Sequence, residues 1–221
     1  MVFTPIRKED LTREEIKRAL ESLIFLVEKR NGRIKARTCA NGSPQREYTP
    51  REEAESPKAS TEAILMTTVV DAKQKGGVMT ADIPNTFVQT NIGERERGQR
   101  IIMKIRGPLV DILVEMAPEV YADYVIIDYN GNKIMYVQMV KALYGVLQSS
   151  LLYYKQFRTD MESIGFVVIP YESCVAKRRV EGSQQTVTWH VDNLKSSHVL
   201  KKVIDEVLLS GYKKSMAASS K

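Results

Sequence analysis

Apolar and polar residues alternate along the chain with two different periods, and each period predicts its own set of elements. Ile16, Leu20, Leu23, Ile24 and Val27 recur at helical spacing, so the pattern predicts an amphipathic helix over residues 12–29. A capping box at residues 12–15, Thr-Arg-Glu-Glu, would begin this helix. The same spacing predicts helices over residues 61–74, 147–164 and 199–209, the last stopped by Gly211.

Short apolar runs bounded by turn residues predict the strands. They cover residues 78–83, 133–140, 173–180 and 185–191. Asn31-Gly32 and Asp192-Asn193 are turn dipeptides and would each form the tip of a hairpin. Residues 41–60 look like loop, and residues 213–221 would be a frayed tail. Residues 91–140 are harder to interpret, although Asn130-Gly131 marks another hairpin, which leads into the strand at 133–140.

Composition restricts the class of protein without selecting a function. The chain has 221 residues, 43% hydrophobic and 27% charged, which is ordinary for a globular protein with a real core. A net charge of +6 leans weakly towards an anionic partner such as nucleic acid. No stretch approaches the roughly 20 apolar residues that span a bilayer, and the charged N-terminus is unlike a signal peptide, so we expect no membrane partner. Two cysteines without metal-ligand spacing favour a reducing compartment.

Two aspartates follow short apolar runs. Asp82 precedes Pro84, which suits the first turn of a helix, and Asp192 closes a predicted strand. Taken alone, an aspartate at a strand end is most often a turn former or a helix cap. If a fold brought these two together, their carboxylates would suit Mg²⁺, which prefers oxygen ligands.

The segments around these aspartates resemble motifs of copia-type retrotransposon reverse transcriptases, in family order. Residues 29–37 resemble the fingers hairpin, with a Lys-Ala-Arg tripeptide at 35–37; residues 82–87 resemble motif A; residues 102–107 resemble the segment after it; residues 141–148, Lys-Ala-Leu-Tyr-Gly-Val-Leu-Gln, resemble motif B; and residues 189–195 resemble motif C. The resemblance implies an α+β right-hand polymerase fold, with a small antiparallel palm sheet backed by helices and the thumb absent.

The resemblance also implies a division of the chain. Residues 1–60 would be the first fingers part, 61–90 the palm with motif A, 91–140 the second fingers part, 141–212 the palm with motifs B and C, and 213–221 a tail. A thumb or RNase H segment would have to be supplied in trans.

The resemblance further implies roles for individual residues. Asp82 and Asp192, with the backbone carbonyl of Ile83, would hold Mg²⁺, and Phe87 would exclude a ribose 2′-hydroxyl. Catalysis would use Asp82, Asp192 and Asn193, the nucleotide would be bound by Lys35, Arg37, Phe87, Gly145 and Gln148, and the nucleic acid by Arg33, Arg95, Arg97 and Arg100. A purely structural role is the alternative for several of them. Lys35 and Arg37 would belong to a solvated strand face, Gly145 to a turn, and Gln148 to the first turn of a helix.

One departure from the family affects the predicted activity. Motif C has two adjacent aspartates in the family, and here the second is Asn193. An amide oxygen binds a cation more weakly than a carboxylate, so Mg²⁺ binding would weaken and Mn²⁺ would be favoured. Thr86 stands where the family commonly has alanine.

The expected function is therefore that of an RNA-directed DNA polymerase core, weakened at motif C. Its partners would be an RNA or DNA template with primer and deoxynucleoside triphosphates, in the cytoplasm (in a virus-like particle) or in the nucleus. The alternative is a non-catalytic nucleic-acid-binding remnant of a decayed element.

Overall fold

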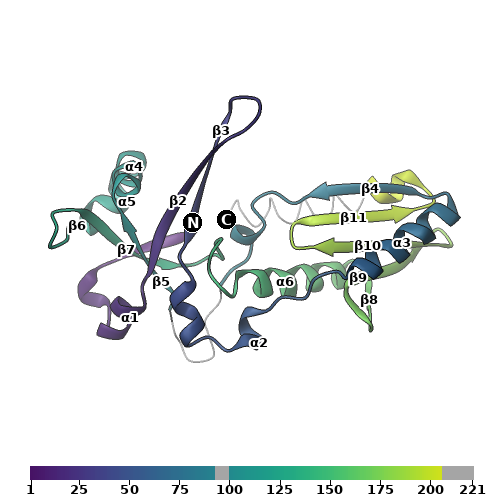
Figure 1. The fold of residues 1–221 in the computed structure, drawn as a ribbon, viewed down its shortest axis with the longest axis horizontal. Coiled ribbons are helices and arrows are strands. Elements are labelled where there is room, and N and C mark those ends of the chain that lie inside the picture. Colours follow the sequence, from purple (N-terminus) through teal and green to yellow (C-terminus); the bar gives the residue numbers. More distant parts are fainter. Residues whose placement is uncertain (93–99, 206–221) are drawn as a thin grey trace. The chain divides into compact units, whose positions relative to one another are not determined.

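The computed structural model describes residues 1–92 and 100–205 and shows a mixed α+β chain with two separate sheets (Figure 1). The chain divides into two compact units. Unit 1 contains residues 1–54 and 91–149, and unit 2 contains residues 55–90 and those from 150 onward. Residues 141–149, predicted to belong with the second palm segment, thus cluster with unit 1. Each unit is built from two stretches of chain that are distant in sequence.

Unit 1 is organised around a sheet of six strands. Its order is β1-β7-β5-β2-β3, with β6 also pairing to β7, and only the β2–β5 pair is parallel. The strands are β1 (Phe3–Ile6), β2 (Leu20–Glu28), β3 (Ile34–Ala40), β5 (Ile102–Arg106), β6 (Ile126–Ile127) and β7 (Lys133–Met139). The helices of this unit are α1 (Arg13–Arg18), α2 (Arg51–Ala54), α4 (Pro108–Met116) and α5 (Pro118–Tyr121), with 3₁₀ turns η1 (Lys8–Asp10), η2 (Ser43–Glu47) and η4 (Ala122–Tyr124).

The predicted helix over residues 12–29 is wrong beyond its first turns. The capping box is confirmed, because the Thr12 hydroxyl accepts from the Glu15 N–H and the Glu15 carboxylate accepts from the Thr12 N–H. Helix α1 nevertheless ends at Arg18, and the apolar run that follows becomes strand β2. Residues 23–27 form an unbroken apolar run, which fits either element, and the strand partners β3 and β5 decide for the strand.

Strands β2 and β3 form a two-stranded ribbon around the turn at Asn31-Gly32, which confirms the predicted hairpin (Figure 1). Pairing with β5 involves only Leu20 and Glu21, so most of β2 has β3 as its strand partner. Large apolar side chains of the ribbon are open to solvent, among them Leu26 at 69% and Ile34 at 72% exposed. The predicted loop over residues 41–60 contains the short helices η2 and α2 instead.

Unit 2 contains an antiparallel sheet of five strands in the order β4-β11-β10-β9-β8. The strands are β4 (Gly77–Asp82), β8 (Val167–Ile169), β9 (Glu172–Val180), β10 (Ser183–His190) and β11 (Asn193–His198). Three of them lie where the alternation predicts strands, within one or two residues at each end. Strand β11 was not predicted as a strand, because its segment Asn-Leu-Lys-Ser-Ser-His carries little apolar signal.

Two predicted helices pack against this sheet. Helix α6 (Ser149–Ser163) contributes Tyr154 and Met161 to a core that also contains Trp189 and Leu194 of the sheet. Successive strand residues point to opposite faces, so Lys195 leaves the sheet on the other side, where it contacts helix α3 (Thr61–Gln74). The helices predicted over 61–74 and 147–164 are therefore both confirmed.

The C-terminal predictions are only partly covered by the structure. Residues 201–205 are helical, but residues 199–200, where the predicted helix would begin, form a bend. Residues 206–209 of that helix, its stop at Gly211 and the predicted tail over 213–221 lie outside the described residues. Within the described part of the chain, no helix has the length and apolar character needed to cross a membrane.

Candidate active site

Asp82 ends a strand of unit 2 and Asp192 lies in a turn between two others, and the backbones of the two residues are adjacent at one end of the sheet. Asp82 is the last residue of β4, and its pairing partner across the sheet is Asn193, the first residue of β11. The Ile83 N–H then donates to the Asp192 carbonyl at 2.8 Å. Antiparallel pairing thus brings together two aspartates that are 110 positions apart in sequence (192 minus 82).

The turn that carries Asp192 is strained. His190 pairs with Asn193, so Val191 and Asp192 form a two-residue loop between β10 and β11. Val191 has φ of 56°, a left-handed conformation that a β-branched residue rarely adopts. Strain of this kind costs on the order of 1–3 kcal/mol and is found preferentially at functional sites. The turn predicted at 192–193 is therefore confirmed, one residue nearer the N-terminus.

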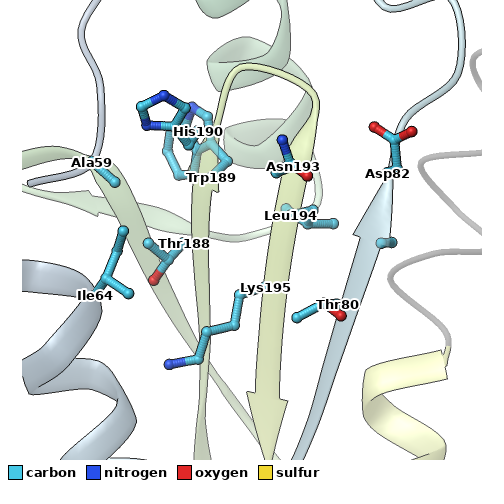
Figure 2. Close-up of a pocket in the computed structure, with 11 residues that line it drawn as sticks. Ala59, Ile64, Thr80, Asp82, Thr188, Trp189, His190, Asn193, Leu194 and Lys195 are labelled. Atoms are coloured by element: carbon cyan, nitrogen blue, oxygen red, sulfur yellow. The ribbon is translucent and has the colours of Figure 1, made fainter. Parts of the chain in front are cut away.

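Asn193 interacts with the neighbouring aspartate. Its Nδ2 donates to the Asp192 Oδ1 at 3.2 Å, and both Asn193 and Asp82 are solvent-exposed (Figure 2). A second carboxylate at position 193 could not make this bond and would instead repel Asp192. With Asn193 in place of a second aspartate, this end of the sheet carries one negative charge fewer than a pair of adjacent aspartates would give it.

The segment after Asp82 is fixed by two buried residues. The Thr86 hydroxyl donates to the Ile83 carbonyl at 2.6 Å, and Thr86 is fully buried. Phe87 begins the 3₁₀ turn η3 (Phe87–Gln89) and is 8% exposed, with its ring edge-on to Tyr153 of α6. Pro84 leads into this turn and not into a longer helix.

A groove of about 390 Å³ lies beside Asp82 and Asn193 on the α3 face of the sheet (Figure 2). Thr80, Asp82, Thr188 and Lys195 contribute side chains to its wall, and Ile64 of α3 lies across from them. The Thr188 hydroxyl is buried, with no hydrogen-bond partner among the described residues. Much of the remaining lining is apolar and includes Ala59, Ala81 and Leu194, so the groove is a largely apolar surface with the Asp82 carboxylate at one end.

Sequence reasoning missed a buried ion pair next to this groove. Lys195 Nζ lies 2.7 Å from Asp71 Oδ2, with only 16% and 6% of the two side chains exposed. The same ammonium group donates to the hydroxyls of Thr67 and Thr68. Asp71 and Lys195 are 124 positions apart (195 minus 71), and the only signal available beforehand was a charged residue, Asp71, inside a predicted helix, because the segment that contains Lys195 is assigned to no element.

The predicted phosphate-binding residues of the first hairpin lie in unit 1. Arg33, in the turn before β3, and Lys35 and Arg37 on β3 are all exposed. The Arg37 guanidinium lies 5.8 Å from the centre of the Tyr144 ring. This side of the ribbon therefore presents positive charge to solvent at period two, as the sequence predicts.

Gly145 and Gln148 are also in unit 1, where packing explains both. Gly145 has φ of 90°, and a Cβ on it would lie 1.8 Å from the Ala40 carbonyl oxygen, so only glycine fits. Gln148 is 7% exposed and donates to the Glu53 carboxylate at 3.1 Å. Gly145 is thus in a turn, as its alternative had it, whereas Gln148 lies just before α6 and not in its first turn, and its contact with Glu53 accounts for its burial.

Arg100 makes a specific structural contact. Its Nε and Nη2 donate to the two carboxylate oxygens of Glu15 at 2.9 and 3.0 Å, and Nη2 also donates to the Asp10 carbonyl. This pairing, opposed in part by burial, lowers the pKa of Glu15 from its ordinary value. Arg95 and Arg97, the other predicted nucleic-acid contacts of this cluster, lie outside the described residues.

The donor set at the sheet end fits Mg²⁺ in kind but is small. Two carboxylates and the Ile83 carbonyl supply oxygen, the ligand type that Mg²⁺ prefers, and the carbonyl still has one lone pair after accepting from Thr86. Nowhere among the residues that the structure describes do three or more His, Cys, Asp or Glu side chains gather in a metal-binding group.

Comparison of the chain with protein-family models gives no match, and a search of curated proteins gives none either.

Proposed function

We propose that the chain is the fingers and palm portion of a copia-type reverse transcriptase, an RNA-directed DNA polymerase of a retrotransposon. The observation that carries the proposal is the meeting of Asp82 and Asp192 at adjacent strand ends. The motif resemblance pairs these two residues although nothing else in the sequence links them. The strained Val191 turn beside Asp192 also supports it, because strain is preferentially retained where function requires it.

In this proposal the sheet end of unit 2 is the catalytic centre. Asp82, Asp192 and the Ile83 carbonyl would hold Mg²⁺, which supplies charge stabilisation for the attacking primer oxygen and the leaving pyrophosphate. The protein's own part is to hold the two aspartates in place through β-pairing, and to leave no room beside the Phe87 ring for a ribose 2′-hydroxyl. The exposed cations Lys35 and Arg37 have the chemistry to neutralise triphosphate oxygens, and Arg33 that to bind a nucleic-acid backbone.

Asn193 sets the expected level of activity. Its amide donates to Asp192, which leaves two carboxylates where the family has three. The protein should therefore need more Mg²⁺ than its Asn193→Asp variant and gain more from Mn²⁺.

Primer extension on an RNA template with a DNA primer tests the proposal. The parent, Asn193→Asp and Asp82→Ala are compared in Mg²⁺ and in Mn²⁺, with Asp160→Ala on α6 as a matched loss of one carboxylate from unit 2. We expect extension by the parent in Mn²⁺, more by Asn193→Asp, background levels with Asp82→Ala and no change with Asp160→Ala. Extension that survives Asp82→Ala, or its absence from both the parent and Asn193→Asp, would refute the proposal.

A non-catalytic nucleic-acid-binding remnant is the second candidate, and the Asn193–Asp192 bond favours it because it weakens the carboxylate pair. This function would use Arg33, Lys35 and Arg37 on phosphates. It predicts binding that weakens steeply with salt and is indifferent to Asp82→Ala. Electrophoretic mobility shifts that weaken between 50 and 200 mM salt and are the same for Asp82→Ala, together with no primer extension by the parent or by Asn193→Asp, would favour this function over the polymerase.

A further inference from the structure

Five aromatic rings form a chain of contacts through the core of unit 2, and Phe87 is at one end of it. Phe87 is edge-on to Tyr153, with ring centres 6.3 Å apart and planes at 82°. Tyr153 stacks on Phe157 at 5.7 Å, and Phe157 is edge-on to Trp189 at 5.3 Å. Trp189 then stacks on Tyr154 at 6.4 Å.

This aromatic chain joins three parts of unit 2. Phe87 follows the motif A-like segment, Tyr153, Tyr154 and Phe157 belong to α6, and Trp189 lies three residues before Asp192. Residues 153 and 157 are one helical turn apart, so they lie on the same side of α6. Phe87 is therefore in direct ring contact with a helix, and through that helix is linked to a strand, both distant from it in sequence.

Tyr153 contributes its ring to this packing, but its hydroxyl has no partner. The residue is 5% exposed, and its hydroxyl makes no hydrogen bond among the described residues. Burial, and then the negative charges of Asp192 and Asp160, raise the pKa of Tyr153, so the phenol stays neutral throughout the working pH range. Tyr153 thus packs an uncharged, buried ring against Phe87.

Tyr154 provides a natural comparison, because it is adjacent and equally buried. It is 8% exposed, packs on Trp189 at the far end of the aromatic chain, and its hydroxyl donates to the Ser173 carbonyl at 3.1 Å. Its ring therefore packs on Trp189, whereas the ring of Tyr153 packs on Phe87. Loss of the ring at 153 or at 154 removes a similar buried volume, but the first removes a ring packed against Phe87 and the second a ring packed against Trp189.

We propose that Tyr153 is a specificity-determining positioning residue, which holds the Phe87 ring where it excludes a ribose 2′-hydroxyl. This inference rests on the proposed polymerase function. Without the Tyr153 ring, Phe87 gains room to turn away, and a ribonucleotide fits better. The deoxynucleotide makes no use of that room, so its incorporation changes less.

The test measures kcat/KM for a deoxynucleotide and for the matching ribonucleotide in Mn²⁺, for the parent and for each variant. Their ratio is independent of the fraction of folded protein, so a purely structural defect does not change it. We expect Tyr153→Leu to lower the ratio about tenfold, the effect of one aromatic contact, and Tyr153→Phe to leave it unchanged. Tyr154→Leu should lower both rates together. Tyr153→Met is measured beside Tyr153→Leu, in case the leucine variant does not fold.

A double-variant cycle shows whether Tyr153 acts through Phe87. Phe87→Ala should lower the ratio further than Tyr153→Leu does, and adding Tyr153→Leu to it should have no further effect. An unchanged ratio in Tyr153→Leu and Tyr153→Met, with a lowered one in Phe87→Ala, overturns this inference and leaves the polymerase standing. Absence of extension by the parent and by Asn193→Asp in both metals overturns the inference and the polymerase together.

Discussion

The motif B-like segment 141–148 of unit 1 and the hairpin at 190–193 of unit 2 carry the same resemblance, but the structure explains them differently. In the first, Gly145 passes against Ala40, and the Leu147 N–H and the Gln148 amide donate to Gln45 and Glu53. In the hairpin, Val191 has a strained backbone conformation, and Asn193, next to Asp192, is exposed to solvent and is not part of the core. Packing alone accounts for the first segment, whereas the second contains a strained turn that packing does not require.

The largest effect should come from breaking the first segment. Gly145→Ala would force a Cβ to within 1.8 Å of the Ala40 oxygen at φ of 90°, so we expect a loss of about 4 kcal/mol or more in unfolding free energy. Gly131→Ala is the control, since Gly131 has φ of 80° in the same unit with nothing within 4 Å, and it should cost about 1 kcal/mol. Urea denaturation measures both, and equal losses would show that close packing at Gly145 is unimportant.

A smaller effect should follow from removing the buried ion pair of unit 2. Lys195→Met leaves Asp71 as an unpaired buried charge, at a cost of about 3 kcal/mol in unfolding free energy. The double variant Lys195→Met/Asp71→Leu should recover part of this loss, because no charge then remains buried. Lys177→Met, which removes an exposed lysine from the same sheet, serves as the control. A double variant less stable than Lys195→Met would contradict the expectation.

The smallest effect concerns the Glu15–Arg100 pair, which tests whether a predicted nucleic-acid contact is structural. Arg100 lowers the folded-state pKa of Glu15, so its stabilisation is present above the unfolded pKa, about 4.3, and is lost as pH falls through the folded value. Arg100→Gln should therefore cost about 0.5–1 kcal/mol at pH 7, and the difference from the parent should shrink below about pH 4. Thermal unfolding from pH 3 to 7 measures this, with exposed Arg33→Gln as the control. A difference that does not vary with pH would exclude the pair as its cause.

Sequence reasoning succeeded where the signal is local. The capping box at Thr12, the turn at Asn31-Gly32 and helix α3 each follow from a few neighbouring residues, and each is confirmed. It failed at residues 20–28, where an apolar run is compatible with either element and the partner strands, distant in sequence, decide. Strand β11 was missed for a related reason, since its residues are polar and pairing with β4 and β10 holds them.

The same distinction between local and long-range signals holds for the residues of the candidate site. The resemblance selected Asp82 and Asp192, and β-pairing brings them together, but no local pattern indicates that pairing. The ion pair between Asp71 and Lys195 and the contact between Phe87 and Tyr153 were not anticipated, because each joins residues more than sixty positions apart that no local pattern pairs. The local sequence predicts which side chains are candidates for the site, and the pairing register of the strands decides which of them become neighbours.

The β2–β3 ribbon has a consequence for how the protein behaves in concentrated solution. Strand β3 is the last strand of its sheet, and exposed Leu26 and Ile34 make the ribbon apolar as well as open at its edge. Such an edge is a template on which another chain can add a strand and begin an aggregate. Lys35 and Arg37 lie on that edge strand, so two ribbons that approach each other bring like charges together. High salt screens this repulsion, and the protein should therefore be most soluble in dilute buffer.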